Sequence, residues 1–120
     1  MTKQGEKEEL LALLGKVKHM PVIVEGKRDQ NVLRLFGFTK ITQIRKGIYE
    51  TAEEAVKKHK RIMILTDFDR EGSKIAAQLT LFLQKLGCKV ESNMRRKIKF
   101  AFVKNKITAI EELKSLLKKR

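Results

Sequence analysis

The sequence predicts an α/β fold, with a mostly parallel sheet of about four strands and helices packed on both faces of the sheet. Short apolar runs rich in β-branched residues alternate with segments whose apolar residues recur at helical spacing. An apolar fraction of 42% over 120 residues is enough to bury one core, and no repeat or flexible linker divides the chain. We therefore expect a single domain over residues 1–120, with its functional residues at the carboxyl ends of the strands.

The first half of the chain is expected to begin with a helix and then to form two strands, each followed by a helix. Leucine and valine residues at helical spacing predict the first helix over 10–17. A β-branched run predicts a buried strand over 22–24, and an amphipathic segment that ends at a glycine predicts a helix over 29–36. Alternating residues predict a strand over 41–45, and a polar segment with small apolar residues on one side predicts a helix over 50–60.

The second half contains the strongest strand signal, an apolar run over 61–65 that is long enough to be buried on both faces. An amphipathic helix over 71–86 is expected to follow it, and then a short strand over 89–91. The segment 94–103 fits both helical and alternating periodicity, and we favour a helix. We expect the core motifs of the domain to lie within residues 20–91.

Residues 92–120 are predicted to form a basic, helical C-terminal extension of this core. Thr108, with Glu111 three residues later, has the capping-box pattern that opens a last helix, which ends in three basic residues at 118–120. Between Met94 and Lys106 the extension contains six basic residues and no acidic one.

The charge of the chain predicts an acidic partner. Lys and Arg number 28 against 14 Asp and Glu, so the net charge is +14, and nucleic acid, either RNA or DNA, is the commonest polyanion for such a protein. A membrane surface is the alternative, which the absence of tryptophan and of a clean amphipathic basic helix disfavours. A single cysteine, no apolar run of about 18 residues and no signal peptide predict a cytoplasmic protein without a membrane partner.

Acidic residues follow two strands that should be neighbours. Glu25 and Asp29 come after the first strand, and Asp67 and Asp69 come after the strongest one. For Asp29, which begins a helix, a capping role is the favoured interpretation. Asp67 and Asp69 have no obvious capping role, and two carboxylates at this spacing can converge on one cation. Carboxylate oxygens suit Mg²⁺, with Mn²⁺ as an alternative, so the sequence predicts a metal site here.

The segments VIVEGKRD and, some forty residues later, ILTDFDREGSKIAAQL resemble the two motifs of the Toprim domain, a Rossmann-like fold of topoisomerases, DnaG-type primases, OLD-family nucleases, RecR and a 5S rRNA maturase. The resemblance implies that Glu25 acts as a general acid/base that also contacts the metal, and that Asp67 and Asp69 bind Mg²⁺. It further implies structural roles for the glycines of the two motifs and of the loop after the second strand, Gly26, Gly47 and Gly72.

Departures from the family pattern limit the function. Ser73 stands where type IA topoisomerases have a second glutamate, so the resemblance does not supply a third metal ligand of that kind. With one tyrosine, Tyr49, and no room for a strand-passage gate, zinc domain or polymerase domain, a complete topoisomerase or primase is excluded.

Two functions remain from the residues and the resemblance. The first is a Mg²⁺-dependent nuclease, with structured or ribosomal RNA as a candidate substrate. The second is a non-catalytic nucleic-acid-binding module that works with a ribonucleoprotein or with a replication or repair protein. In both, basic residues near the motifs and in the extension are predicted to contact nucleic acid: Lys27, Arg28, Arg45, Lys46, Arg70, Arg95 and Arg96. Phe100 and Phe102 are interleaved with basic residues and can stack on bases, although a core position is favoured for both.

Overall fold

A computed structural model describes residues 2–117 of the chain, with side chains from residue 5 onward. Each element expected from the sequence is present, although the first helix begins earlier than expected and the second strand is shorter. The elements in chain order are α1 (Thr2–Val17), β1 (Val22–Val24), α2 (Lys27–Leu35), β2 (Ile41–Gln43), α3 (Ile48–Lys58), β3 (Arg61–Ile64), α4 (Arg70–Lys85), β4 (Lys89–Val90), α5 (Ser92–Lys104) and the 3₁₀ helix η1 (Ile110–Leu117).

The four strands form one parallel sheet in the order β2-β1-β3-β4, which confirms the predicted α/β architecture. Val22 pairs with Ile41 of β2 on one side and with Met63 of β3 on the other. From β1 the chain moves to one side of the sheet, and from β3 it moves to the other, so the strand order reverses between β1 and β3. In open α/β sheets, ligands bind beside the carboxyl ends of the strands at such a switch point.

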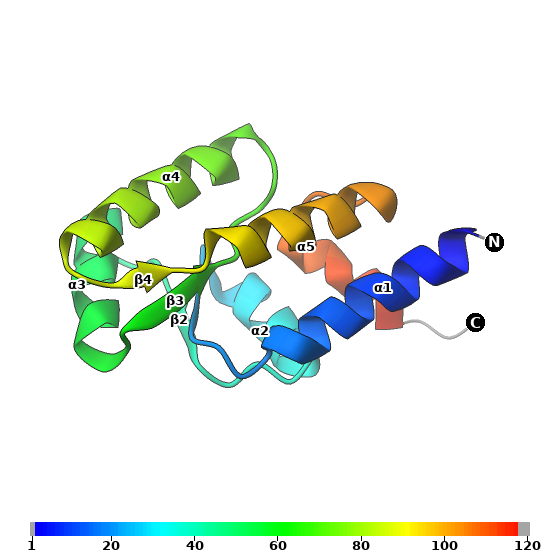
Figure 1. Ribbon diagram of the computed structural model, residues 1–120, viewed down its shortest axis with the longest axis horizontal. Helices are drawn as coiled ribbons and strands as arrows, with labels where there is room; N and C mark the ends of the chain where they lie inside the picture. Colours follow the sequence, from blue (N-terminus) through cyan, green and yellow to red (C-terminus); the bar gives the residue numbers. More distant parts are fainter. Residues whose placement is uncertain (1, 118–120) are drawn as a thin grey trace.

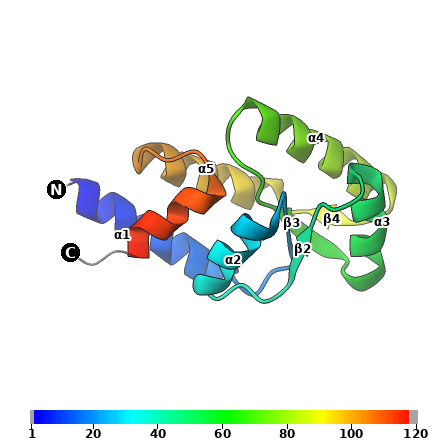
Figure 2. The same ribbon diagram turned by 180° about the vertical axis from the view of Figure 1, so that it is seen from behind.

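Helices cover both faces of the sheet, as expected (Figures 1 and 2). On one face α1, α2, α5 and η1 pack together around the buried side chains of Val24 and Leu65. On the other face α3 and α4 bury Ile62 and Leu79. Two of the helices are followed by glycines with positive φ, +95° at Gly37 and +87° at Gly87, a backbone conformation that glycine adopts without strain.

The C-terminal segment packs into the first core, since Ile110 and Leu113 are completely buried there. The ambiguous segment 94–103 is helical, as favoured. The last helix differs from the expectation in two ways. It is a 3₁₀ helix, and the carboxylate that accepts from the backbone N–H groups of Thr108 and Ala109, just before the helix, at 2.8 Å each, belongs to Glu112 and not to Glu111. The three basic residues at 118–120 lie outside the described residues.

The two phenylalanines of α5 have opposite environments. Phe102 is completely buried, as favoured, and its ring meets the ring of Phe68 edge-on at 4.7 Å between centroids. Phe100 is 62% exposed, so the core position favoured for it is wrong. The two residues are 200° apart around an α-helix, so they cannot face the same core. Among the described residues, no helix is long and apolar enough to span a membrane.

Candidate functional site

The predicted acidic residues lie together at the switch point of the sheet. Glu25 follows β1 directly, and Asp67 follows β3 after two buried residues, Leu65 and Thr66. The Thr66 hydroxyl donates to the carbonyl oxygen of Gly72 at 2.7 Å, which closes the loop between β3 and α4. The loop therefore holds Asp67 beside Glu25. The effect of each acidic residue on the pKa of its neighbours indicates which carboxylates lie close together.

Glu25 carries the most unusual polar atom of the site. Its Oε2 atom is buried and has no hydrogen-bond partner among the described residues. Burial raises the pKa of Glu25 above its ordinary value, and the negative charge of Asp67 raises it further. The backbone N–H of Asp67 opposes this rise in pKa, while the charges of Asp29 and Asp69 add to it. A buried carboxylate oxygen without a donor is suited to a proton or a cation.

Asp67 connects the site to the C-terminal segment. Its Oδ1 atom accepts a hydrogen bond from the backbone N–H of Ile110 at 2.8 Å, and the N–H of Phe68 donates to the carbonyl oxygen of Thr108 at 2.9 Å. Burial raises the pKa of Asp67, the Ile110 N–H opposes this, and the charge of Asp69 adds to the rise. One carboxylate oxygen of Asp67 is thus engaged in the fold, and the other is available to the site.

The expectation that the aspartate pair has no capping role is wrong for Asp69. Asp69 is the N-cap residue of α4, and its Oδ1 atom accepts from the backbone N–H of Gly72 at 2.7 Å. Asp29 has the capping role that was favoured, but from within the helix. It is the third residue of α2, and its Oδ2 atom accepts from the N–H of Gly26, the N-cap residue, at 3.3 Å.

Arg95 reaches into the site from α5, where its partners differ from the phosphate that was expected. Its guanidinium donates to the carbonyl oxygens of Ile64, Thr66 and Asp67 at 3.0, 3.1 and 3.3 Å. It also lies over the ring of Phe68, 4.6 Å from the centroid. Burial lowers the pKa of Arg95 to about 10, and the charges of Glu25 and Asp67 oppose this shift. Arg95 therefore holds the end of β3 in place and compensates the carboxylates.

The predicted glycines have different roles in the structure. A Cβ atom on Gly72 would lie 2.1 Å from the carbonyl oxygen of Asp67, so only glycine fits where α4 passes this loop. Gly26 has an extended backbone, with φ −151°, and open space at its Cβ position, so no tight turn requires a glycine there. At Gly47 the backbone is also extended, and a Cβ atom would meet only the end of the flexible Glu50 side chain.

The other predicted basic residues surround the site on the surface. Lys27, Arg28 and Arg70 are exposed at the beginnings of α2 and α4, and among the described residues they form no ion pair. Arg96 is also exposed, and it donates to the side chain of its neighbour Asn93 at 2.7 Å. These four side chains are free to meet a polyanion, whereas Arg95 is committed to the fold.

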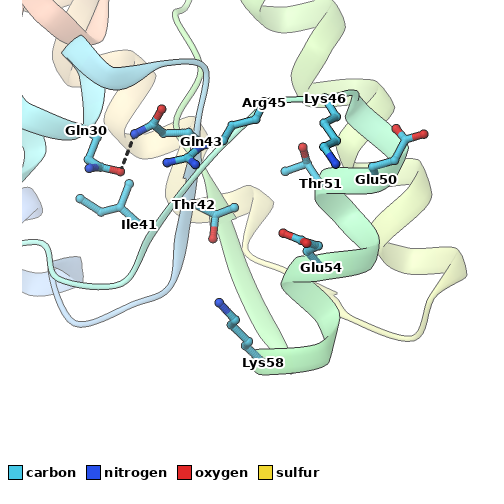
Figure 3. A pocket seen from close by; sticks show the side chains of 10 residues that line it. All are labelled: Gln30, Ile41, Thr42, Gln43, Arg45, Lys46, Glu50, Thr51, Glu54 and Lys58. Carbon is cyan, nitrogen blue, oxygen red and sulfur yellow. Dashed lines mark hydrogen bonds between the residues drawn. The ribbon is translucent and has the colours of Figure 1, made fainter.

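Arg45 and Lys46 line a pocket of about 400 Å³ at the open edge of β2 (Figure 3). The pocket lies at the carboxyl end of β2, because its lining residue Gln43 is the last residue of that strand and pairs with Val24, the residue before Glu25. The side-chain amide of Gln43 donates to Gln30 at 2.9 Å across the pocket wall. The remaining lining residues come from β2 and α3: Ile41, Thr42, Glu50, Thr51, Glu54 and Lys58.

The donor set fits a hard divalent cation that needs few protein ligands. Within the described part of the chain, no three His, Cys, Asp or Glu side chains already converge at the spacing of metal ligands. However, Glu25 Oε2 is buried without a partner in the described part of the chain, and Asp67 and Asp69 each use one oxygen in the fold and leave the other open. Mg²⁺ keeps several waters and shares phosphate oxygens with its substrate, and Mn²⁺ accepts the same ligands, so the residues suit either ion.

Sequence reasoning missed two acidic neighbours of the site. Burial raises the pKa of Asp67 most, and the negative charges of Glu112 and Glu111 add to that rise, while the charge of Glu111 also raises the pKa of Asp29. Glu111 therefore lies near the site, whereas the sequence pattern had assigned it to a helix cap. No local signal identifies this position, because it depends on where the C-terminal segment packs.

Comparisons with known proteins place this geometry in context. The model of the Toprim domain matches residues 21–105. A UPF0292 protein of Pyrococcus abyssi is 39% identical over 97 residues, which are 79% of this chain and 72% of that protein. A UPF0292 protein of Methanocaldococcus jannaschii is 37% identical over 120 residues, covering 94% of this chain and 93% of that protein. The solved structure of a protein from Aquifex aeolicus matches with a TM-score of 0.72 at 25% identity, covering 88% of this chain and 95% of that one.

Proposed function

Because this chain belongs to the Toprim domain family, we propose that it is a Mg²⁺-dependent nuclease that hydrolyses phosphodiester bonds, with structured or ribosomal RNA as the first substrate to test. The family indicates a metal-dependent function on nucleic acid in general, and the proposal adds the reaction. The observation that carries it is the buried Oε2 atom of Glu25, which has no partner among the described residues and faces the charge of Asp67 at the switch point.

In this proposal Asp67 and Asp69 hold the ion through the carboxylate oxygens that the fold leaves open. When bound, Mg²⁺ supplies a Lewis acid at a phosphate oxygen of the substrate. Glu25 holds or moves a proton at Oε2, either by accepting it from the attacking water or by donating it to the leaving oxygen. In the metal-free protein, burial and the charge of Asp67 raise the pKa of Glu25 above its ordinary value, which suits a group that both accepts and donates a proton.

The exposed cations around the site are assigned to the substrate. Lys27 and Arg70 begin the helices that follow the two acidic loops, so they stand where phosphates beside the ion would lie. Their charges would stabilise the negative charge that develops at phosphorus. Arg45 and Lys46 would contact the next part of the strand at the edge of β2. In the fold, Arg95 positions the Asp67 loop and is not assigned to phosphate.

A second function is favoured by one observation, the lack of a preformed group of three ligands among the described residues. Ser73 in place of a glutamate is consistent with this. In this alternative the protein is a non-catalytic nucleic-acid-binding module that uses the ion to hold a phosphate, within a ribonucleoprotein or a replication or repair assembly. It predicts salt-sensitive binding without turnover.

The two functions are separated by cleavage assays on end-labelled RNA and DNA, single-stranded, duplex and hairpin, with Mg²⁺, Mn²⁺ or EDTA. We expect Asp67→Asn to abolish cleavage and to keep binding, because asparagine can still accept the Ile110 N–H. Glu25→Gln should reduce cleavage by about 10²- to 10⁴-fold, the usual contribution of a general acid/base. Cleavage that persists in EDTA or in Asp67→Asn would contradict the proposal, and binding without cleavage by the wild type would favour the module.

Asp69 provides a matched pair of variants that separates capping from metal binding. Asparagine caps helices as well as aspartate does, so Asp69→Asn should fold normally and lose metal-dependent activity. Asp69→Ala should lose the activity and, in addition, about 0.5–2 kcal/mol of stability, because the N–H of Gly72 loses its acceptor. Full activity in Asp69→Asn would remove Asp69 from the metal site and leave it as a cap only.

A further inference from the structure

The outward face of α5 combines exposed apolar side chains with positive charge. Phe100 and Val103 are 62% and 63% exposed, and they lie one helical turn apart at the centre of this face. Arg96, Lys97 and Lys99 are exposed around them. We call these five residues the α5 surface. The helix contains no acidic residue, so its charge is not balanced from within.

The position of Phe100 is not explained by packing. The inward face of α5 is complete without it, since Ile98 and Phe102 are both fully buried against the sheet and α1. An aromatic ring that faces water beside three cations gains neither core burial nor an ion pair. Aromatic rings among basic residues are the means by which proteins bind single-stranded nucleic acid, because bases stack on the ring while phosphates meet the cations.

The α5 surface begins next to the candidate metal site. Arg95 ties the first turn of the helix to the backbone of Thr66 and Asp67, at the carboxyl end of β3. From Arg96 to Val103 the helix then extends by about 10 Å, at about 1.5 Å per residue. Figure 1 shows α5 running from the end of β4 away from the strands, toward the N-terminal part of α1. A strand with a phosphate at Asp67 can therefore continue along this helix.

We propose that the α5 surface is a stacking site for single-stranded nucleic acid. An unpaired base lies on the ring of Phe100, and the neighbouring phosphates meet Arg96, Lys97 and Lys99. The inference rests on the proposed function and names its substrate class, a strand that is single-stranded next to the cleaved bond. A duplex fits less well, because its base faces are covered by stacking within the helix. An anionic membrane also fits less well, since amphipathic membrane helices bury a broader apolar face than two residues provide.

The test is the fluorescence anisotropy of the full chain with a labelled single-stranded oligonucleotide and with a duplex of the same length, in EDTA so that cleavage does not contribute. Phe100→Ala should weaken binding of the single strand by about 5- to 140-fold, the range that corresponds to one stacked base. Binding of the duplex should change little. Phe100→Tyr keeps a stacking ring and should bind as the wild type does.

Leu81 provides the matched control, because it is 51% exposed on α4, away from the α5 surface. Leu81→Ala removes a comparable exposed apolar side chain and should leave the affinity unchanged. Lys99→Gln should lower the salt dependence of single-strand binding by about 0.7 in the slope of log affinity against log salt. Thermal unfolding of each variant checks that the fold is retained. We expect it to be retained, because the replaced side chains are exposed.

Wild-type affinity of Phe100→Ala for the single strand would overturn the inference, as would an equal loss for single strand and duplex. If Phe100→Ala lost binding to vesicles that contain phosphatidylserine but kept its binding to oligonucleotides, the inference would be overturned in favour of a membrane. The binding result does not depend on catalysis, because Asp67→Asn, which is expected not to cleave, should still bind nucleic acid in the same assay. A protein that never cleaves but loses single-strand binding in Phe100→Ala would keep this inference and refute the nuclease.

Discussion

Replacing Arg95 by methionine tests the electrostatic design of the site. Methionine keeps an apolar stem near Phe68 but removes the guanidinium, so three backbone carbonyl oxygens lose their donor. Glu25 and Asp67 lose the positive charge that acts on both of them. Hydrogen bonds from a charged donor are worth about 1.5–3 kcal/mol each, so the three bonds set a gross loss of about 4.5–9 kcal/mol.

The cost of burying the cation offsets much of this gross loss. Burial lowers the pKa of Arg95 to about 10, which shows that the fold disfavours the charge it holds. Removing one partner from a buried set of charges typically costs about 3–5 kcal/mol, and we expect a net loss near 3 kcal/mol. In urea unfolding, with a slope of about 1–3 kcal/mol per M, the midpoint of Arg95→Met should fall by about 1–3 M.

Arg96 is the control, because it is the next residue, is exposed and donates a hydrogen bond to the side chain of its near neighbour Asn93. Arg96→Met should change stability by less than about 0.5 kcal/mol. Added Mg²⁺ should recover part of the loss in Arg95→Met, since the ion supplies positive charge at the same carboxylates. A wild-type urea midpoint for Arg95→Met, or an equal loss in Arg96→Met, would refute the reasoning.

Two further predictions concern the backbone and the titration of the site. Gly72→Ala should cost about 3 kcal/mol or more in urea unfolding because its Cβ atom would meet the backbone of Asp67, whereas Gly26→Ala, in open space, should cost at most about 1 kcal/mol. Burial raises the pKa of Asp67 and of Glu25 above their ordinary values of 3.8 and 4.5. Above those ordinary values the folded state therefore binds more protons than the unfolded state, and the metal-free protein should lose stability as the pH rises. Mg²⁺ should raise the melting temperature at neutral pH and much less in acid, and an equal effect at both pH values would count against a carboxylate site.

The architecture could be predicted because its signals are local. The buried run at β3 and the glycines after α2 and α4 specify where strands and helices lie, and the parallel direction of the strands follows from their alternation with helices. The positions of Glu25, Asp67 and Asp69 at the end of these strands were likewise readable from the chain. They follow from which residue comes after which strand.

What could not be predicted depends on contacts between distant segments. Asp67 accepts from Ile110, 43 residues later, and Arg95 donates to carbonyl groups 28 to 31 residues earlier. A backbone carbonyl leaves no trace in a sequence, so an arginine that binds three of them resembles one that binds phosphate. For Asp69 the signal was present and was misread, since an aspartate that begins a helix three residues before a glycine N–H is an ordinary cap.

The link between the Asp67 loop and the Thr108–Ile110 segment also fixes when the site is completed during synthesis. The chain emerges from the ribosome from its N-terminus, so the loops that carry Glu25 and Asp67 are made before Arg95 and long before Ile110. Until those residues arrive, the acidic loops have neither their compensating cation nor the backbone amide that orients Asp67. The charge-balanced site is therefore among the last parts of this fold to form, and a nascent chain holds its carboxylates without the geometry that the finished protein gives them.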